Sequence, residues 1–119
     1  DYFLVLKHRN SVETWSSSVI NFSQFTNQAN YDFSDLSSKA FGNNMKQVDT
    51  SPVRFAVYSG DENQNGIVDL TDVVNVTNAA NAFINGYVSS DMNGDNLSDL
   101  ADVVITSNNA GAFVAKVIP

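Results

Sequence analysis

Residues 61–72 read DENQNGIVDLTD, and residues 91–102 read DMNGDNLSDLAD. The second stretch repeats the first at a distance of 30 positions, and the register continues downstream through further identical pairs. These pairs are Val73/Val103, Val74/Val104, Asn78/Asn108, Ala80/Ala110, Ala82/Ala112 and Phe83/Phe113. Each copy is therefore a polar loop followed by the same predicted helix, and this internal repeat organises the second half of the chain.

Oxygen-bearing side chains occupy loop positions 1, 3, 5, 9 and 12 in both copies. Calcium loops take ligands from these positions, together with the backbone carbonyl of position 7, because Ca²⁺ binds about six to eight oxygen atoms. One Asp- and Asn-rich stretch is typical of an ordinary turn, but two copies in register favour metal sites. We predict two Ca²⁺ sites, with ligands Asp61, Asn63, Asn65, Ile67, Asp69 and Asp72 in the first loop and Asp91, Asn93, Asp95, Leu97, Asp99 and Asp102 in the second.

Other loop positions predict backbone geometry. Position 6 needs a positive φ angle, which Gly66 adopts without strain and Asn96 tolerates better than most residues. The helix is expected to start near position 10, so Asp69 and Asp99 can cap its free N–H groups. The first loop has three carboxylates among its ligands and the second has four. Fewer charges mean weaker calcium binding, so we expect the second loop to bind more tightly.

The segments before the loops lack the pattern of a helix, so each unit is a loop with an exit helix. The pattern Gly60-Asp-x-Asn-x-x-Gly-x-Val-Asp-x-x-Asp72, repeated once, resembles the dockerin type I repeats of secreted bacterial proteins and covers about half the chain. The resemblance implies EF-hand-like calcium units, two Ca²⁺ ions, an extracellular or bacterial cell-surface location and docking onto a protein partner. Residues 7–15 also look like the β region that precedes dockerin-like repeats in large secreted surface proteins.

The chain departs from dockerins that bind cohesins. Those carry a Ser-Thr pair at loop positions 10 and 11 and a basic pair further along the helix. Here the first pair is replaced by Leu70-Thr71 and Leu100-Ala101, and the second by Thr77-Asn78 and Ser107-Asn108. The resemblance therefore transfers calcium binding residue by residue but does not transfer cohesin recognition.

Both predicted helices carry an apolar stripe with spacings of three or four residues, which we expect to pack the helices together as core. Its members are Val73, Val76, Ala80, Phe83, Val103, Ala110 and Phe113. The remaining face of the first helix carries Asn75, Asn78, Asn81 and Asn85, which form an uncharged polar surface.

Residues 1–58 alternate like β structure, so we predict an α+β chain. A small antiparallel β domain, a partial sandwich, covers residues 1–58, and the dockerin-like calcium-binding domain covers residues 59–119. The predicted strands are Tyr2–Lys7, Val12–Trp15, Val19–Phe22, Tyr31–Phe33, Lys46–Val48 and Val53–Tyr58. One helical turn is expected over Asp35–Phe41, with Ser34 as its cap and Gly42 as its end.

Composition excludes several functions. Cysteine is absent from the 119 residues, so disulfides, thiolate metal sites and cysteine nucleophiles are excluded. The apolar runs are too short to cross a bilayer. Residues 60–119 hold eight acidic side chains and one basic one, so the whole net charge of −7 lies there. Nucleic acid and anionic membranes are therefore not expected as partners.

Catalysis is not expected. Asp32 and Asp35 flank a turn, where Asp is common, and His8 lies beside two basic residues and is expected at the surface. His8 and the serines at 16–18 make a weak hydrolytic set. Trp15 is expected in the core, with sugar stacking as the alternative.

We therefore predict a non-catalytic extracellular module that binds calcium and mediates protein association. The strand at residues 2–6 is apolar on both faces and needs cover on both. Two explanations stay open: donation of this strand to identical subunits, head to tail in a filament, or a fragment whose further strands lie upstream. Docking onto a cohesin-like receptor and carbohydrate binding are the alternative functions, and Asn21 and Asn75 lie in N-glycosylation sequons.

Overall fold

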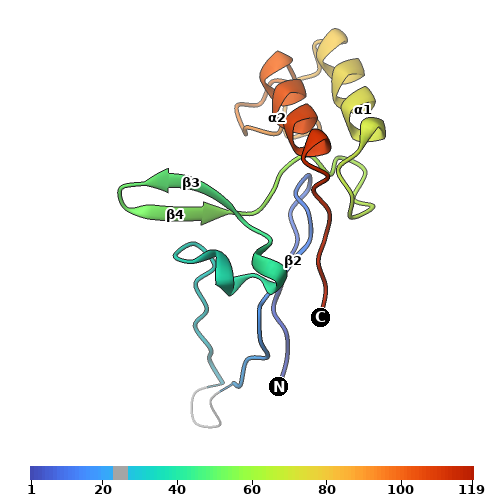
Figure 1. Cartoon of the computed structure of the whole chain (residues 1–119). Coiled ribbons are helices and arrows are strands. Elements are labelled where there is room, and N and C mark those ends of the chain that lie inside the picture. The colour runs from blue at the N-terminus through green and yellow to red at the C-terminus, as the bar shows by residue number, and fades with distance from the viewer. Residues whose placement is uncertain (23–26) are drawn as a thin grey trace. The chain divides into compact units, whose positions relative to one another are not determined.

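The computed structural model describes residues 1–22 and 27–119 and has a mixed α+β fold (Figure 1). In the described residues, two antiparallel strand pairs precede two α-helices. The chain forms two compact units, and neither unit is one continuous stretch. One unit, here the β unit, comprises Asp1–Leu6, Glu13–Val57 and Val117–Pro119; the other, the helical unit, comprises Lys7–Val12 and Tyr58–Lys116.

The first strand pair of the β unit is short. β1 (Val5–Leu6) pairs antiparallel with β2 (Thr14–Trp15), at positions inside the two predicted strands. The regular ladder stops at Ser16, whose hydroxyl accepts the Leu4 N–H at 3.0 Å and donates to the Ser18 carbonyl. A buried hydroxyl thus takes the place of a backbone acceptor, which explains why the strands are shorter than predicted.

The second strand pair is a hairpin. β3 (Lys46–Thr50) and β4 (Val53–Ala56) are antiparallel, with a register shift between Gln47 and Asp49. All five residues of β3 are exposed. Both predicted strands are present with other bounds: β3 runs two residues beyond the predicted end at Val48, and β4 ends at Ala56 instead of Tyr58.

Several predictions for the β unit are wrong in the described residues. Tyr31–Phe33 forms no strand, and Val19–Phe22 contributes only one bridge, at Ile20, so the two sheets have two strands each and the strands expected to complete a sandwich are missing. The helical turn is instead a pair of 3₁₀ helices, η1 (Ser37–Lys39) and η2 (Phe41–Asn43). Ser34 does not cap them, because its N–H and hydroxyl both donate to the Asp32 carboxylate.

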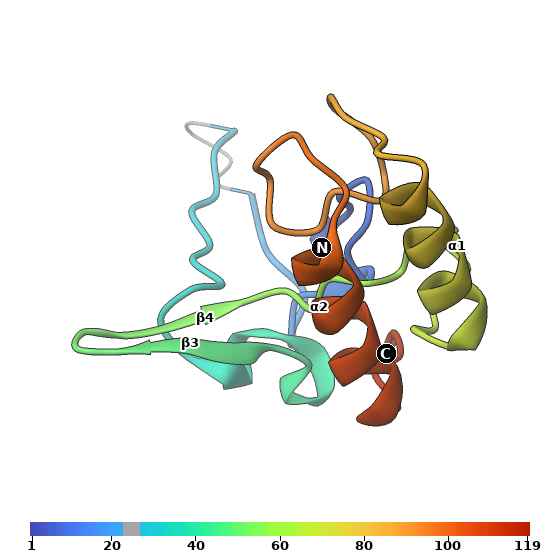
Figure 2. The same cartoon turned by 90° about the horizontal axis from the view of Figure 1, so that it is seen from above.

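Two helices of equal length form the helical unit. α1 (Leu70–Asn81) and α2 (Leu100–Gly111) both begin at loop position 10, as predicted. They lie side by side in both views (Figures 1 and 2). Asp69 and Asp99 cap them, also as predicted, and each cap is completed by the carboxylate at position 12, which accepts the N–H of the capping residue. The small core centres on Val12, Val68 and Val114, with Tyr58 and Ala110 against it.

The helix ends correct one part of the predicted core. Phe83 and Phe113 are 79% and 89% exposed. Both follow their helix in the left-handed region, with φ of 52° and 55°, and their N–H groups bond back to the carbonyls of Ala80 and Ala110. This Schellman-type ending reverses the chain, so the rings continue outward instead of along the apolar stripe.

Neither helix among the described residues is long and apolar enough to cross a membrane.

Candidate metal centre

The first loop is held together by its first and last carboxylates. Asp61 Oδ2 accepts the Gly66 N–H at 2.9 Å. Asp72 accepts the Asn63 N–H at 3.2 Å through Oδ1 and the Asp69 N–H at 2.9 Å through Oδ2. Both carboxylates are buried, with exposures of 2% and 0%. Positions 1 and 12 therefore anchor the loop from inside.

The second loop repeats this arrangement with more hydrogen bonds. Asp91 accepts the N–H groups of Gly94 and Asp95 through Oδ1 and that of Asn96 through Oδ2. Asp102 accepts three backbone N–H groups, those of Met92, Asn93 and Asp99. Asp91 and Asp102 are as deeply buried as their counterparts in the first loop.

Side chains at positions 3 and 5 shape the loops in the same way. In the first loop, Asn63 and Asn65 each accept the N–H two residues further on, at 2.9 Å. In the second loop, Asn93 and Asp95 do the same at the same distance. These Asx turns are local, so each loop obtains its curvature from its own sequence.

Left-handed backbone occurs at two positions in each loop. Gly66 and Asn96 at position 6 have φ angles of 89° and 67°, which confirms the prediction for that position. Position 4 is also left-handed, with φ of 59° at Gln64 and 82° at Gly94. The sequence predicted only position 6, although the glycine at 94 was a signal for position 4.

Each loop is bridged to the segment that follows a helix. The first loop bonds the segment after α2, through Val68 N–H to the Val114 carbonyl and Lys116 N–H to the Gly66 carbonyl. Ser98 N–H to the Ile84 carbonyl and Gly86 N–H to the Asn96 carbonyl join the second loop to the segment after α1.

These bridges also orient position 7. The carbonyl of position 6 and the N–H of position 8 form hydrogen bonds with the segment that follows the helix. Because successive carbonyls in an extended segment point to opposite sides, the carbonyls of Ile67 and Leu97 point away from that segment. This orientation fits the predicted use of the position-7 carbonyl as a ligand.

Asp61 provides the test of whether a cation fits. Its Oδ1 atom is buried and has no hydrogen-bond partner. Burial raises the pKa of the Asp61 carboxyl above its usual value, while the Gly66 N–H acts in the opposite direction. A buried anionic oxygen without a donor is costly unless a cation neutralises it. All donors predicted for the first loop are oxygens, which suits a hard cation such as Ca²⁺.

The carboxylates of the loops do not form a metal-binding cluster of their own among the described residues. Within residues 1–22 and 27–119, no three His, Cys, Asp or Glu side chains are grouped so that they can hold a metal ion. The structure brings the position-1 and position-12 carboxylates of each loop onto backbone N–H groups. The predicted ligand sets also rely on Asn side chains and a backbone carbonyl.

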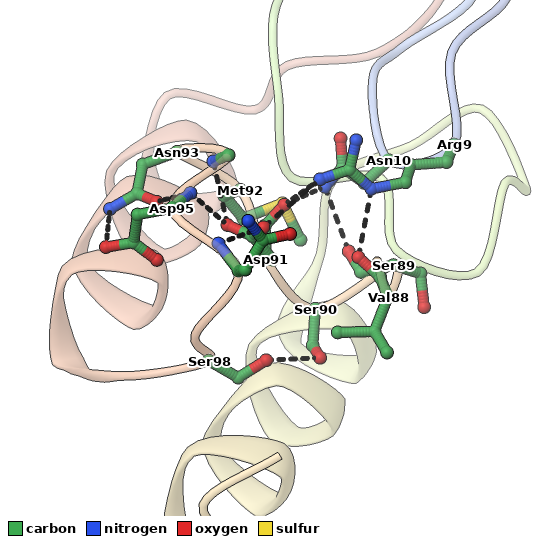
Figure 3. A network of polar contacts seen from close by, with 12 residues as sticks. Arg9, Asn10, Val88, Ser89, Ser90, Asp91, Met92, Asn93, Asp95 and Ser98 are labelled. Atoms are coloured by element: carbon green, nitrogen blue, oxygen red, sulfur yellow. Dashed lines mark hydrogen bonds and ion pairs between the residues drawn. The ribbon is translucent and has the colours of Figure 1, made fainter. Parts of the chain in front are cut away.

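Sequence reasoning missed a third segment at this site. The turn Lys7–Val12 belongs to the helical unit, and its Arg9 and Asn10 side chains contact the start of the second loop (Figure 3). Glu62, at position 2, accepts from Asn75 and from the hydroxyl of Ser89. Contacts across such long sequence separations leave no local periodicity, so no pattern in the sequence indicated them.

The other candidates make local contacts. His8 is exposed, as expected, and its Nδ1 lies 3.1 Å from Asn10 Oδ1. Trp15 is only partly buried and donates from Nε1 to Glu13. Hydrogen bonds from Ser34 lower the pKa of Asp32, which is typical of a turn carboxylate.

The two sequons differ in their surroundings. The amide of Asn75 donates to Glu62 Oε2 at 2.9 Å and is therefore engaged. Asn21 is exposed, but the serine at position 23 of its sequon lies outside the described residues.

Comparison of the chain with protein-family models, curated proteins and solved structures found no match.

Proposed function

We propose that the chain is a non-catalytic, extracellular calcium-binding module of the dockerin-like kind, which holds one Ca²⁺ ion in each loop and mediates protein association. The observation that carries the proposal is the buried Asp61 Oδ1, which has no partner inside a loop whose ligand positions hold oxygen donors. The recurrence of the same loop geometry in residues 91–102 supports a second site.

The residues that would hold the ions are the six predicted in each loop. When bound, Ca²⁺ supplies positive charge that offsets the carboxylates of positions 1, 9 and 12. Backbone N–H groups hold these oxygens in place through hydrogen bonds to Asp61 and Asp72 and to their counterparts in the second loop. Extracellular calcium modules need only millimolar to submillimolar affinity, so sites of moderate charge suffice.

Thermal unfolding with and without calcium tests this proposal. A ligand at 100 times its Kd stabilises a fold by about 2.7 kcal/mol per site. Two such sites raise the Tm of a chain this size by roughly 10–25 °C. Excess chelator is expected to remove that gain, whereas Mg²⁺ at equal concentration restores little of it. An unchanged Tm would contradict the proposal.

The helices also offer a surface for a protein partner. An apolar groove of 420 Å³ is lined by residues near the end of α1 and the start of α2, including Phe83 and Leu100. A second groove of 470 Å³ occupies the corresponding place, with Phe113 and Leu70. Exposed aromatic rings beside paired grooves favour docking onto a receptor, as in the cohesin-like alternative.

Variants of the exposed rings test this docking surface. Phe83→Ser and Phe113→Ser each lie outside the core and are expected to leave the Tm within about 2 °C. A pull-down with cohesin domains, in calcium and in chelator, measures recognition. Capture by the wild type that is lost in the double variant supports receptor docking, and capture that both proteins show equally contradicts it.

Self-assembly through the first strand is a second candidate for the association. β1 pairs with β2 of its own chain; Leu6 in β1 is 40% exposed, and Tyr2, which precedes β1, is 68% exposed. An exposed apolar edge suits pairing with a neighbouring subunit. Particle size in calcium tests this route: deletion of residues 1–6 is expected to leave monomers where the intact chain forms filaments. A monodisperse intact monomer at high concentration would exclude it.

A further inference from the structure

Asn10, in the turn Lys7–Val12, contacts the backbone just before the first loop and the start of the second loop. Asn10 is 1% exposed, and its carbonyl accepts the N–H of Gly60, which directly precedes the first loop, at 2.8 Å. Its side-chain amide donates to the carbonyl of Ser89 at 3.0 Å and to that of Asp91 at 2.6 Å (Figure 3). One buried amide thus binds two backbone carbonyls, one just before the second loop and one at its first residue.

Arg9 also binds the backbone at the start of the second loop. Its Nε donates to the carbonyl of Val88 at 3.0 Å, and Nη2 donates to that of Asp91 at 2.9 Å. The guanidinium carbon lies 4.3 Å from the centre of the Tyr87 ring, and Nη2 lies 3.4 Å from Asp91 Oδ2. A planar group with several donors can make all these contacts at once.

The turn is also fastened to the first loop. Gln64 Nε2 donates to the carbonyl of Ser11 at 3.1 Å and to that of Asp61 at 2.7 Å. Val12 continues into the core beside Val68, at loop position 8. The turn is therefore held by the first loop and by the core while its side chains hold the second loop.

We propose that residues 7–12 are a positioning element for the second calcium loop, so that the calcium affinity of this loop is set by residues 79 to 82 positions away in the sequence. The inference rests on the proposed calcium binding. The contacts fix the backbone that carries Asp91, the first ligand, before any ion binds. Groups that orient a metal ligand typically change metal affinity about 10–100-fold when removed.

Two variants separate geometry from charge. Asn10→Ala removes the two hydrogen bonds that the side-chain amide donates, without changing any charge. Arg9→Lys keeps the charge but cannot reproduce the fork of donors. Asn108→Ala, at an exposed position of α2, and Arg54→Lys, in the β unit, are matched controls. Arg9→Ala is less informative, because loss of a positive charge near the site favours the cation and opposes the loss of positioning.

Calorimetric titration of the full chain with Ca²⁺ measures the effect at each loop. In an Asp61→Asn background, which disables the first loop, Asn10→Ala and Arg9→Lys are expected to raise the Kd of the second loop about tenfold. In an Asp91→Asn background, they are expected to change the Kd of the first loop less than twofold. An equal change at both loops, or no change at the second, overturns the proposal.

Amide hydrogen exchange of the calcium-free chain provides a reading that does not depend on metal. The variants are expected to speed exchange at residues 88–93 about tenfold relative to the controls, while α1 stays protected. Unchanged exchange there overturns the positioning role even if calcium binds. If the wild type binds no calcium, the proposed function fails, and with it the claim about affinity, whatever exchange shows.

Discussion

The two loops share one backbone and differ in what surrounds their first carboxylate. In the first loop, Asp61 Oδ1 has no hydrogen-bond partner. In the second loop, both oxygens of Asp91 accept backbone N–H groups, and Arg9 lies beside them. The loop shape is therefore encoded within each repeat, whereas the electrostatic state of the site depends on residues from elsewhere in the chain.

The charges of the loops differ in two opposing ways. The second loop has an additional carboxylate, Asp95, where the first has Asn65. It also has the Arg9 cation beside Asp91, its first predicted ligand. Asp95 is itself at a predicted ligand position, while the Arg9 guanidinium also donates to the carbonyls of Val88 and Asp91. We therefore keep the expectation that the second loop binds Ca²⁺ more tightly.

Removal of the last carboxylate of a loop is expected to have the largest effect. Asp72→Ala and Asp102→Ala each delete a predicted ligand, a capping box and buried hydrogen bonds. The expected loss in the free energy of unfolding is about 2–4 kcal/mol without calcium, together with loss of one bound ion. The loss is larger at Asp102, which accepts three N–H groups where Asp72 accepts two.

Urea unfolding in chelator and calcium titration measure these effects, with Asp49→Ala at an exposed position of β3 as the control. Losses no larger than that of the control would show that the two loops are not anchored by position 12.

Substitution at position 6 compares the two loops by backbone strain. Gly66→Ala places a Cβ in the left-handed region, at φ 89°, and 2.7 Å from the Lys116 side chain, which can move aside. The expected loss is about 1–2 kcal/mol, caused mainly by strain. Asn96→Gly in the second loop is expected to change stability by less than about 0.5 kcal/mol, because Asn already tolerates φ 67°. Equal effects in thermal unfolding would contradict the shared geometry.

The local features of the helical unit follow from its sequence. The helix starts, the caps at Asp69 and Asp99 and the positive φ at position 6 all depend on neighbouring residues, and the structure confirms them. The outward turn of Phe83 was missed because an apolar residue at helical spacing looks like core. Its location after the helix end, in the left-handed region, decides otherwise.

The β unit was predicted less well for a physical reason. The segments of both strand pairs are visible as alternation, but their lengths depend on side chains such as Ser16, which replaces a ladder bond. The contact of residues 7–12 with the second loop depends on long-range packing. A short turn with Arg9 and Asn10 has the same local pattern whether or not it touches another part of the chain.

Exchange of position 5 between the loops tests the effect of charge with a smaller change. Asn65→Asp gives the first loop a fourth ligand carboxylate, and Asp95→Asn leaves the second loop with three. Each is expected to change the Kd of its own loop roughly threefold to tenfold, in opposite directions, because ligand charge tunes affinity. The double exchange is expected to reverse the order of the two loops in a calcium titration. An unchanged order would show that the charge at position 5 does not set the difference between the loops.

The smallest effect is expected outside the repeat, at Asp32 in the β unit. Hydrogen bonds from Ser34 lower the pKa of this carboxyl below its ordinary 3.8. The ionised form therefore stabilises the fold above pH 3.8, and this contribution is lost as the pH falls through the lowered pKa.

Asp32→Asn is expected to flatten the stability profile slightly below pH 4, without any effect on calcium binding. Urea unfolding between roughly pH 2 and 6, in calcium-free buffer, measures the profile. A change in Ca²⁺ affinity in this variant would show that Asp32 is coupled to the predicted calcium sites.

Calorimetric titration of the chelator-stripped full chain with Ca²⁺ measures whether each loop holds one ion, as proposed. We expect two ions per chain at submillimolar to millimolar Ca²⁺, reduced to one by Asp61→Asn or Asp91→Asn and to none by both. Heat of binding that is absent at several millimolar Ca²⁺, or that persists unchanged in the double variant, would contradict it.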